Sequence, residues 1–375
     1  MNTRVIIIGA GASGLACAIR LKQNNSRIDV CVCERMETPG KKILATGNGR
    51  CNLTNTEAQN YAEVKAFFNS IGLVLKELDG GRVYPYSLKA ETVLAVLLDE
   101  CKKRGINILT GCAVLSVLHN GSGKGGFTVK TEKGDFDADF VVCAAGGKAQ
   151  NALGSNGSGY ALLRALGHSV TPLSPGLVML TSSSKYPRAV KGTRARCGIK
   201  IVTDGKEAAH EYGEVLFTDY GLSGIAVMDI SAAVSKAFAG GEKPKCLAEI
   251  DLIPELSESE VLGHINRFGS LKGILGSKLA EIIEKQAAGS VQTQAKIAKC
   301  WRLILTGTKG FDAAQITCGG IPLDEVSDFE SKKAGGLFIC GELLDKQFPC
   351  GGFNLDFAWH SGIAAADNIA KRVQI

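Results

Sequence analysis

The chain has 375 residues with a formal net charge of +6, and 45% of its residues are hydrophobic. This length and composition are typical of a globular protein with two or three packed lobes, and they exclude a disordered or fibrous chain. No apolar run reaches the ~20 residues of a spanning helix, and glycine and serine interrupt the N-terminal run too often for a signal peptide, so we expect a cytoplasmic protein.

The first predicted strand, residues 5–8, runs into a glycine-rich turn and then into a helical pattern over residues 15–21. The turn reads Gly9-Ala10-Gly11-Ala12-Ser13-Gly14 and has the G-x-G-x-x-G spacing of a dinucleotide-binding fingerprint. The first glycine permits the tight bend, the second lets the backbone approach a pyrophosphate, and the third lets the helix pack closely on the strand. Because the helix start also offers free N–H groups to phosphates, we predict a dinucleotide site here.

A second strand is expected over residues 28–33, and it ends at Glu34, twenty residues after Gly14. A carboxylate at this place accepts hydrogen bonds from ribose hydroxyl groups. Another G-x-G-x-x-G sequence, at residues 121–126, lies between two strand-like runs and opens no helix. We interpret this second copy as a hairpin turn.

The rest of the chain predicts a discontinuous domain with an insertion. The pattern changes character near residue 172, and strand and helix signals like those of the N-terminal part return near the C-terminus. We therefore expect one domain from residues 1–171 plus 308–375, a β-rich substrate domain at 172–256 and a helical subdomain at 257–307. The expected strands are 106–109, 114–118, 127–131, 136–142, 177–181, 199–203, 247–252, 314–317 and 337–340, and the expected helices are 57–70, 88–104, 160–167, two or three within 257–301, and 355–371.

Thirteen cysteines are present, an odd number in a chain that is not a small secreted one. None forms a C-x-x-C pair, and Cys31 and Cys33 lie within a predicted strand, where they cannot build a tetrahedral site. We expect most of them to be small buried thiols kept reduced, and we expect no structural metal.

A basic stretch lies in the predicted insertion, between residues 182 and 200, and it contains no acidic residue. A second basic stretch covers residues 272–309. Such stretches are consistent either with a solvated face or with a binding surface for a polyanion. The basic residues of the first stretch are Lys185, Arg188, Lys191, Arg194, Arg196 and Lys200.

Four segments together resemble the BaiN/YhiN-like bacterial flavoproteins, which are FAD-dependent oxidoreductases of the two-dinucleotide-binding-domain type. They are the fingerprint at residues 9–14, GKKILATGNGRCNLTN at 40–55, GEVLFTDYGLSG at 213–224, and GELLD at 341–345 with CGGFNL at 350–355. The likeness covers essentially the whole chain. It implies an α/β fold, in which a Rossmann-like FAD-binding domain carries inserted β-barrel-like and helical subdomains.

The resemblance also implies which residues contact FAD. Those for the diphosphate and ribose are Gly9, Gly11, Ala12, Ser13, Gly14, Glu34 and Arg35. Those lining the flavin are Lys42, Thr46, Asn48, Gly49, Arg50, Cys51 and Asn52, and Gly352, Phe353 and Asn354 are expected beneath it. Val114 is expected at the adenine, Ala145 and Gly146 over the dinucleotide, and Gly341 and Glu342 at the ribityl chain.

The predicted last helix supports this assignment physically, because its N-terminus at Asn354 can stabilise negative charge that develops on a flavin. The sequence contains no second fingerprint that opens a helix, so NAD(P)H is expected to act as a transient electron donor at the flavin face.

Members of this group are associated with reduction of a C=C bond conjugated with a carbonyl. Two substrate classes follow from the resemblance: uridine in large-subunit (23S) ribosomal RNA, giving dihydrouridine, and small enones such as 3-oxo-Δ4 steroid or bile acids. Because an RNA backbone needs several cations, the basic stretch favours ribosomal RNA as partner. A flavin amine oxidase is a further alternative.

The reduction also needs a proton donor within hydrogen-bond reach of the substrate. The candidate catalytic residues are Cys350, Cys51 and Tyr86, with Tyr84 and His360 as further possibilities. For Cys51, a buried thiol packed beneath the flavin is the competing interpretation. Tyr86 can instead stack on a planar substrate or pack within the protein.

Overall fold

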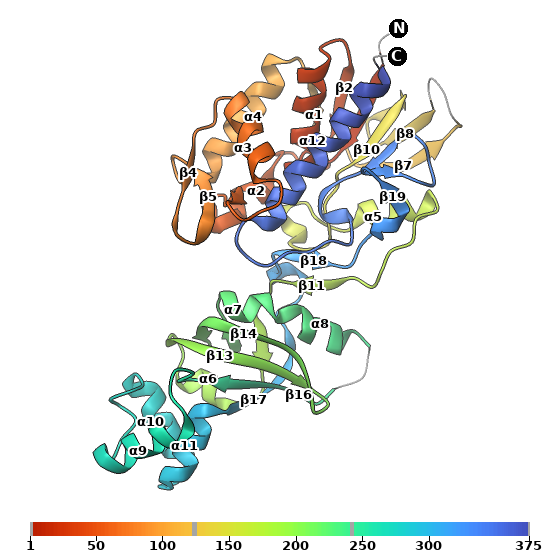
Figure 1. Cartoon of the computed structure of the whole chain (residues 1–375). Helices are drawn as coiled ribbons and strands as arrows, with labels where there is room; N and C mark the ends of the chain where they lie inside the picture. Colours follow the sequence, from red (N-terminus) through yellow and green to blue (C-terminus); the bar gives the residue numbers. More distant parts are fainter. Residues whose placement is uncertain (1–2, 122–125, 241–243, 374–375) are drawn as a thin grey trace. The chain divides into compact units, whose positions relative to one another are not determined.

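The computed structural model describes residues 3–121, 126–240 and 244–373 (Figure 1). The chain forms two compact units. We call Met1–Leu173 with Ile316–Ile375 the discontinuous unit, and Ser174–Gln315 the insertion. The predicted boundary at residue 257, which separates two subdomains within the insertion, stays a prediction.

A seven-stranded sheet forms the centre of the discontinuous unit, in the order β19-β20-β21-β10-β1-β2-β6. The strands from β21 to β6 are parallel, as in a Rossmann fold. Both faces are buried, so the strands are continuous apolar runs. The sheet strands are β1 (Arg4–Ile8), β2 (Asp29–Cys33), β6 (Asn107–Leu109), β10 (Phe140–Cys143), β19 (Val326–Ser327), β20 (Glu330–Ser331) and β21 (Leu337–Ile339).

Strand β1 shows how the two faces are filled. Its odd residues, such as Val5 and Ile7, belong to a core shared with helices α1 (Ala12–Asn24), α4 (Ala90–Lys103) and α12 (Phe353–Val373). Its even residues, such as Ile6 and Ile8, face a second core. This alternation follows from the two-residue period of a strand.

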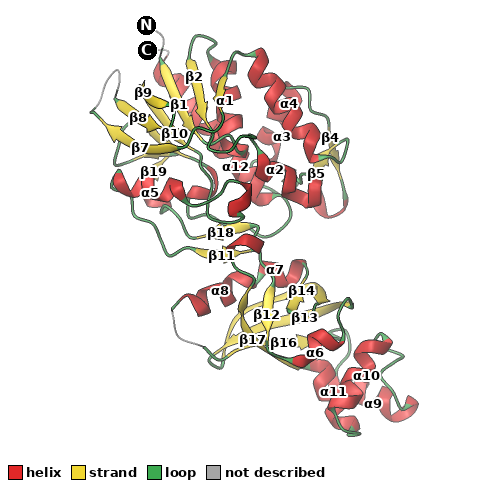
Figure 2. Cartoon of the chain, turned by 180° about the vertical axis from the view of Figure 1, so that it is seen from behind, coloured by secondary structure: helices red, strands yellow, loops and turns green. Residues whose placement is uncertain are grey.

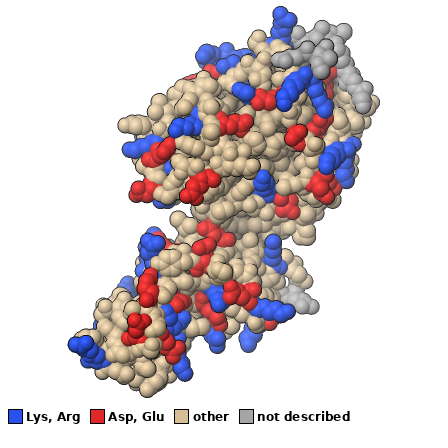
Figure 3. All heavy atoms as spheres, viewed as in Figure 1, with Lys and Arg blue, Asp and Glu red and all other residues tan. Residues whose placement is uncertain are grey.

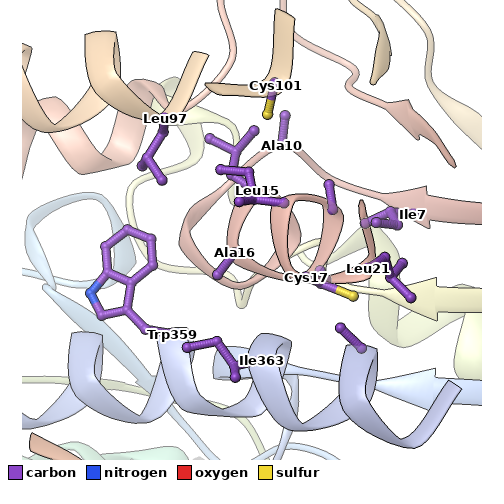
Figure 4. Close-up of a cluster of buried hydrophobic side chains, with 14 of the residues drawn as sticks. Ile7, Ala10, Leu15, Ala16, Cys17, Leu21, Leu97, Cys101, Trp359 and Ile363 are labelled. Atoms are coloured by element: carbon purple, nitrogen blue, oxygen red, sulfur yellow. The ribbon is translucent and has the colours of Figure 1, made fainter. Parts of the chain in front are cut away.

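Helices α1 and α12 pack against each other although they lie at opposite ends of the sequence (Figure 4). A Cβ atom added at Gly362 would lie only 2.1 Å from the carbonyl oxygen of Ser13, so only glycine allows this approach. Trp359 and Ile363 of α12 lie on the side of α1 that carries Ala16, and all three belong to the same core.

The second core lies beneath a three-stranded antiparallel meander and helix α5 (Ser158–Ala165). The meander strands are β7 (Val114–His119), β8 (Phe127–Thr131) and β9 (Gly134–Ala138). The predicted single strand at 136–142 is wrong, because the chain leaves the meander at Asp139 and then enters the central sheet as β10. The hairpin turn predicted at 121–126 falls largely outside the described residues.

Residues 41–103 form a layer beside α1. They begin with helix α2 (Lys41–Ala45), and a small sheet in the order β3-β5-β4 follows with helix α3 (Tyr61–Ser70). Because the predicted helices at 57–70 and 88–104 correspond to α3 and α4, both are confirmed. The strands are β3 (Thr54–Asn55), β4 (Leu75–Glu77) and β5 (Arg82–Pro85), and β18 (Ile316–Cys318) begins the return of the chain to this unit.

A closed six-stranded barrel forms the insertion, in the order β12-β15-β14-β13-β16-β17 (Figure 2). Alternate residues of β13, such as Cys197, Ile199 and Ile201, fill its interior. The insertion begins with the short strand β11 (Ser174–Gly176). The barrel strands are β12 (Leu180–Ser182), β13 (Arg194–Thr203), β14 (Lys206–Phe217), β15 (Gly221–Ser223), β16 (Cys246–Asp251) and β17 (Trp301–Thr308).

Helices complete the insertion. Three of them lie within the stretch predicted to be helical, but that prediction extended one residue too far, because Trp301 begins strand β17. The helices are α6 (Lys185–Ala189), α7 (Ile225–Asp229), α8 (Ser231–Ala239), α9 (Glu258–Phe268), α10 (Ser277–Gln286) and α11 (Val291–Lys299).

The predicted fold class, a Rossmann-like α/β domain with inserted β-barrel-like and helical parts, is confirmed. Among the described helices, none combines the length and the apolar character needed to cross a membrane.

Candidate functional site

The glycine turn after β1 is shaped by the contacts of its own backbone. Gly9 has a φ of +101°, and a Cβ atom there would lie 2.6 Å from the carbonyl oxygen of Ala144. A Cβ atom at Gly14 would lie 1.9 Å from the carbonyl oxygen of Gly9. At Gly11, by contrast, no atom lies within 4 Å of an added Cβ. Gly9 and Gly14 are therefore needed for packing, whereas Gly11 faces open space that a phosphate can enter.

Glu34 fastens this turn to the end of β2. Its carboxylate is 7% exposed and accepts hydrogen bonds from the backbone N–H of Ala10 and of Met36, each at 2.8 Å. Each carboxylate oxygen has a further lone pair, so Glu34 can still accept a hydrogen bond from a ribose hydroxyl. The neighbouring Arg35 is exposed.

The segment that follows α2, residues 46–52, has an unusual backbone, and we call it the asparagine loop. Gly47, Asn48, Gly49 and Cys51 all have left-handed φ angles of 55°, 59°, 80° and 56°. Two of these four residues are not glycine. Non-glycine residues with a left-handed backbone are rare, and they occur most often at functional sites, where the surrounding structure holds them in this conformation. Asn48, Gly49 and Arg50 are exposed.

Two side-chain contacts hold the asparagine loop in place. Thr46 donates a hydrogen bond from Oγ1 to the carbonyl oxygen of Ile43 at 2.6 Å. The Arg50 guanidinium lies over the ring of Tyr84, 5.2 Å from its centre, which places one of the predicted flavin residues above a buried aromatic ring.

Cys51 is fully buried within this loop. Burial raises the pKa of its thiol to about 12, although a hydrogen bond with Thr46 lowers it in part. The thiol is therefore protonated and weakly acidic at neutral pH. This environment suits a packing role better than proton transfer.

An ion pair joins the N-terminal and C-terminal parts of the site. Lys42 Nζ lies 2.8 Å from Glu342 Oε2, and both side chains are mostly buried. The other carboxylate oxygen of Glu342 accepts a hydrogen bond from the backbone N–H of Thr317 at 2.7 Å. Glu342 therefore joins its own segment to those of Lys42 and Thr317, and its carboxylate does not point freely toward a ligand.

The start of α12 packs directly on β3. A Cβ atom at Gly352 would lie 2.5 Å from the carbonyl oxygen of Thr54 and 3.0 Å from Asn52 Oδ1. Asn55 Nδ2 donates a hydrogen bond to the carbonyl oxygen of Gly351 at 3.1 Å. We call residues 46–55 together with residues 351–354 the cradle. Within it, the Asn354 amide pairs with both backbone groups of Phe348, so it shapes the preceding loop.

Among the buried side-chain nitrogen and oxygen atoms of the cradle, Asn52 Oδ1 is the one without a hydrogen-bond partner in the described part of the chain. Within residues 3–121, 126–240 and 244–373, this buried acceptor has no hydrogen-bond donor, and Asn52 is 8% exposed. An unsatisfied buried polar group costs about 1–3 kcal/mol, so a donor from outside the chain, a ligand or a water, is expected to pair with this oxygen. The cradle and the glycine turn therefore fit a dinucleotide whose ring system carries an N–H donor.

The other predicted cofactor residues also lie in the discontinuous unit. Gly341 approaches the fingerprint, since a Cβ atom there would lie 2.8 Å from Ser13 Oγ. Ala145 and Gly146 follow β10, and Gly146 has a φ of +72°. Val114 is the first residue of β7. Their contacts with FAD stay a prediction.

The three candidate proton donors have different surroundings. Cys350 is half-buried and directly precedes the cradle glycines, whereas Cys51 is sealed in the core. Tyr86 is 66% exposed at the end of β5, with Lys76 Nζ 5.5 Å from its ring centre. The structure therefore favours Cys350 and Tyr86 over Cys51. His360 is held by Glu63, with Nδ1 and Oε2 2.5 Å apart.

The basic stretch of the insertion is paired with acidic residues of its neighbouring strand and turn. Lys191 lies 2.5 Å from Asp219, Lys200 lies 2.9 Å from Glu207, and Arg194 pairs with Glu214. Figure 3 shows basic and acidic side chains interspersed on the visible face of the insertion. Arg196 and Lys185 instead lie over the rings of Tyr212 and Tyr186. Much of the positive charge seen in the sequence is thus neutralised locally.

Sequence reasoning missed several polar residues that hold the site together. Thr54, Asp356 and Thr317 bond to segments far away in the sequence, and Ser361 Oγ accepts a hydrogen bond from the backbone N–H of Gly341. Asp356 had one usable signal, because it is an acidic residue between the apolar residues Leu355 and Phe357 in the first turn of α12.

The chain matches a model of the HI0933-like protein Rossmann domain over residues 3–64 and 58–368. It is 36% identical to a 3-dehydro-bile acid delta(4,6)-reductase of Clostridium scindens, covering 98% of this chain and 99% of the relative. It is 29% identical to a ribosomal RNA dihydrouridine synthase of Escherichia coli, covering 97% of each protein.

Solved structures show the same fold. A 3-ketosteroid delta1-dehydrogenase from Sterolibacterium denitrificans, in complex with 1,4-androstadiene-3,17-dione, matches with a TM-score of 0.56 and 12% identity over 98% of this chain and 99% of that one. A flavocytochrome c3 fumarate reductase in an open conformation matches with a TM-score of 0.53 and 16% identity, over 100% of this chain and 79% of that one.

Proposed function

Since the chain belongs to the HI0933-like family, we propose that it is an FAD-dependent reductase of a C=C bond conjugated with a carbonyl. The predicted membership of the BaiN/YhiN-like group and the predicted oxidoreductase class are both confirmed by the full-length relatives. The observation that carries the proposal is the cradle, with its unpartnered buried acceptor Asn52 Oδ1 and its backbone contact at Gly352.

The geometry supports the following roles for the residues that would hold FAD. The glycine turn and the start of α1 receive the diphosphate, Glu34 accepts the ribose hydroxyls, and Asn52 accepts an N–H donor. When bound, the flavin supplies the hydride for the β-carbon of the substrate. The protein must then deliver a proton to the α-carbon, and we assign this to Cys350 Sγ, with Tyr86 Oη as the alternative.

The electron donor in this proposal is NAD(P)H. The fingerprint at residues 9–14 would hold FAD, so the nicotinamide would bind transiently where the substrate binds later. We place the reaction in the cytoplasm, where buried thiols such as Cys51 stay reduced.

A small enone is the substrate class that the charges favour. Lys191, Arg194 and Lys200 pair with carboxylates, which reduces the net charge that the basic stretch offers to an RNA backbone. A steroid or bile acid carboxylate needs only one or two cations. Uridine in ribosomal RNA remains the second candidate, because two full-length relatives are named ribosomal RNA dihydrouridine synthase.

An anaerobic reoxidation experiment tests the proposal. The purified protein is reduced with NADH or NADPH, and then a 3-oxo-Δ4 steroid or fragments of large-subunit ribosomal RNA are added. We expect the steroid to restore the spectrum of oxidised flavin. Reoxidation by RNA alone reverses the substrate assignment, and reoxidation by neither contradicts the reductase. Bleaching by an amine without nicotinamide identifies an amine oxidase instead.

Matched variants identify the proton donor. We expect Cys350→Ala to slow substrate-dependent reoxidation while reduction by NAD(P)H stays unchanged, because only the second step needs the proton. Cys300→Ala is the control, since Cys300 is the other half-buried cysteine and lies in the insertion. If Cys350→Ala is as active as the control, Tyr86→Phe is compared with Tyr212→Phe, which changes another exposed tyrosine.

A further inference from the structure

Asp356 carries a buried negative charge in the first turn of α12. The residue is 2% exposed. Its Oδ1 accepts a hydrogen bond from Thr54 Oγ1 at 2.6 Å, and its Oδ2 accepts hydrogen bonds from Asn60 Nδ2 at 2.9 Å and Asn60 N at 3.3 Å. All three donors are neutral groups, so these bonds hold the carboxylate without cancelling its charge.

These hydrogen bonds join the two halves of the cradle. Thr54 follows Asn52 by two residues, and its carbonyl oxygen is the group that excludes a side chain at Gly352. Trp359 Nε1 adds a hydrogen bond to the carbonyl oxygen of Leu53 at 3.1 Å, one helical turn after Asp356. The bond between Thr54 and Asp356 therefore sets where Asn52 lies relative to the start of α12.

The charge of Asp356 also opposes the dipole of the helix. A helix N-terminus behaves as about half a positive charge, and a carboxylate in the first turn offsets it. The offset is strong at a buried site, because little water screens it. The N-terminus of α12 thus offers less stabilisation to negative charge in the cradle than a bare helix end does.

We propose that Asp356 is a positioning residue that fixes Thr54, two residues after Asn52 of the asparagine loop, on α12 and whose charge lowers the reduction potential of the flavin held by the cradle. The inference rests on the proposed function, because it requires FAD in the cradle. Reduction adds negative charge to the ring system, and a nearby carboxylate disfavours that change. A lower potential makes the bound cofactor a stronger hydride donor toward an enone.

The test is the midpoint potential of protein-bound FAD, measured by equilibrium with a reference dye and without substrate. We expect Asp356→Asn to favour the reduced state about tenfold, which for a two-electron couple corresponds to an increase of about 30 mV. Asp367→Asn is the matched control, because Asp367 lies on the same helix but pairs with Arg20. Equal potentials for the two variants overturn the proposed charge effect.

A second variant separates position from charge. Thr54→Val removes the hydrogen bond but keeps the carboxylate, so we expect weaker FAD binding, about tenfold in Kd, without an increase in potential. Thr54→Ser is expected to restore the affinity. If Asp356→Asn does not fold, unchanged FAD affinity in Thr54→Val overturns the inference. A wild-type protein that binds FAD but reduces neither substrate contradicts the proposed function and leaves this inference standing.

Discussion

The carboxylates around the cradle and those beside the basic stretch of the insertion have different surroundings. In the discontinuous unit, carboxylates such as Glu34, Glu342 and Asp356 are largely buried, and each bonds to segments distant in sequence. In the insertion, Glu207, Glu214 and Asp219 pair with lysine and arginine at the surface of one hairpin and the turn that follows it. Buried carboxylates with several donors contribute more to stability than exposed pairs do, so we expect mutations in the two units to differ sharply.

The largest effect is expected from glycines of the fingerprint. Gly14→Ala places a Cβ atom 1.9 Å from the Gly9 carbonyl oxygen, and we expect it to destabilise the fold by about 3 kcal/mol or more.

Gly11→Val meets open space, so we expect normal thermal unfolding of the apoprotein but loss of the yellow flavin colour. Absorbance spectra and melting curves measure both. Stoichiometric flavin in Gly11→Val contradicts the assigned phosphate site.

The next largest effect is expected at the ion pair between Lys42 and Glu342. Glu342→Gln leaves the mostly buried ammonium group without its carboxylate partner, and we expect a loss of about 2 kcal/mol in the free energy of unfolding. Urea unfolding of the apoprotein measures it. Glu207→Gln is the control, since its partner Lys200 is exposed, and no measurable change is expected. If Glu342→Gln and Glu207→Gln lower the free energy of unfolding equally, the proposed difference between buried and exposed carboxylates is wrong.

A smaller, pH-dependent effect is expected at Glu325 in the discontinuous unit. Burial alone raises the pKa of this carboxyl, but hydrogen bonds from Ser169, Lys333 and His168 outweigh it and lower the pKa to about 2. The unfolded value is about 4.3, so Glu325 stabilises the fold above that pH and loses this contribution as the pH falls toward 2.

Melting temperatures of the wild type and Glu325→Gln, recorded between about pH 6 and pH 3, test this expectation. We expect the wild type to melt higher near pH 6 and the difference to shrink as the pH falls through about 4. Asp324→Asn serves as the neighbouring control. A difference that is constant with pH contradicts the assigned role.

The smallest effect is expected in the basic stretch. We expect replacement of both Lys191 and Lys200 by methionine to leave the melting temperature unchanged, because both form exposed ion pairs. RNA affinity over a range of salt concentrations gives the second measurement. A salt slope reduced by about two identifies these lysines as phosphate contacts and favours the ribosomal RNA substrate.

Local signals explain what the sequence could predict. The fingerprint was recognisable because strand, turn and helix are consecutive, and Glu34 lies at a fixed distance from Gly14. Strand β14 was missed because most of it is polar and exposed, so it lacks the alternation of a half-buried strand. Strand β17 does alternate between buried and exposed residues, but it was also missed, because the stretch predicted to be helical ran on to its first residue, Trp301.

The site depends on partners that no local pattern identifies. The contacts between Lys42 and Glu342 and between Thr54 and Asp356 each span about 300 residues, so only the folded chain reveals them. The same holds for the basic stretch, since its acidic partners follow on β14 and the turn after it. The positive charge of the basic stretch therefore correctly predicted that it is exposed, but it did not predict the acidic residues with which it pairs.

The close approach of Gly362 to Ser13 has a consequence for biosynthesis. Helix α1 leaves the ribosome early, but it acquires its packing partner only when α12 at the end of the chain has been made. The insertion is continuous, so its barrel can close while translation is still under way. The two halves of the cradle can therefore meet only after α12 has been made.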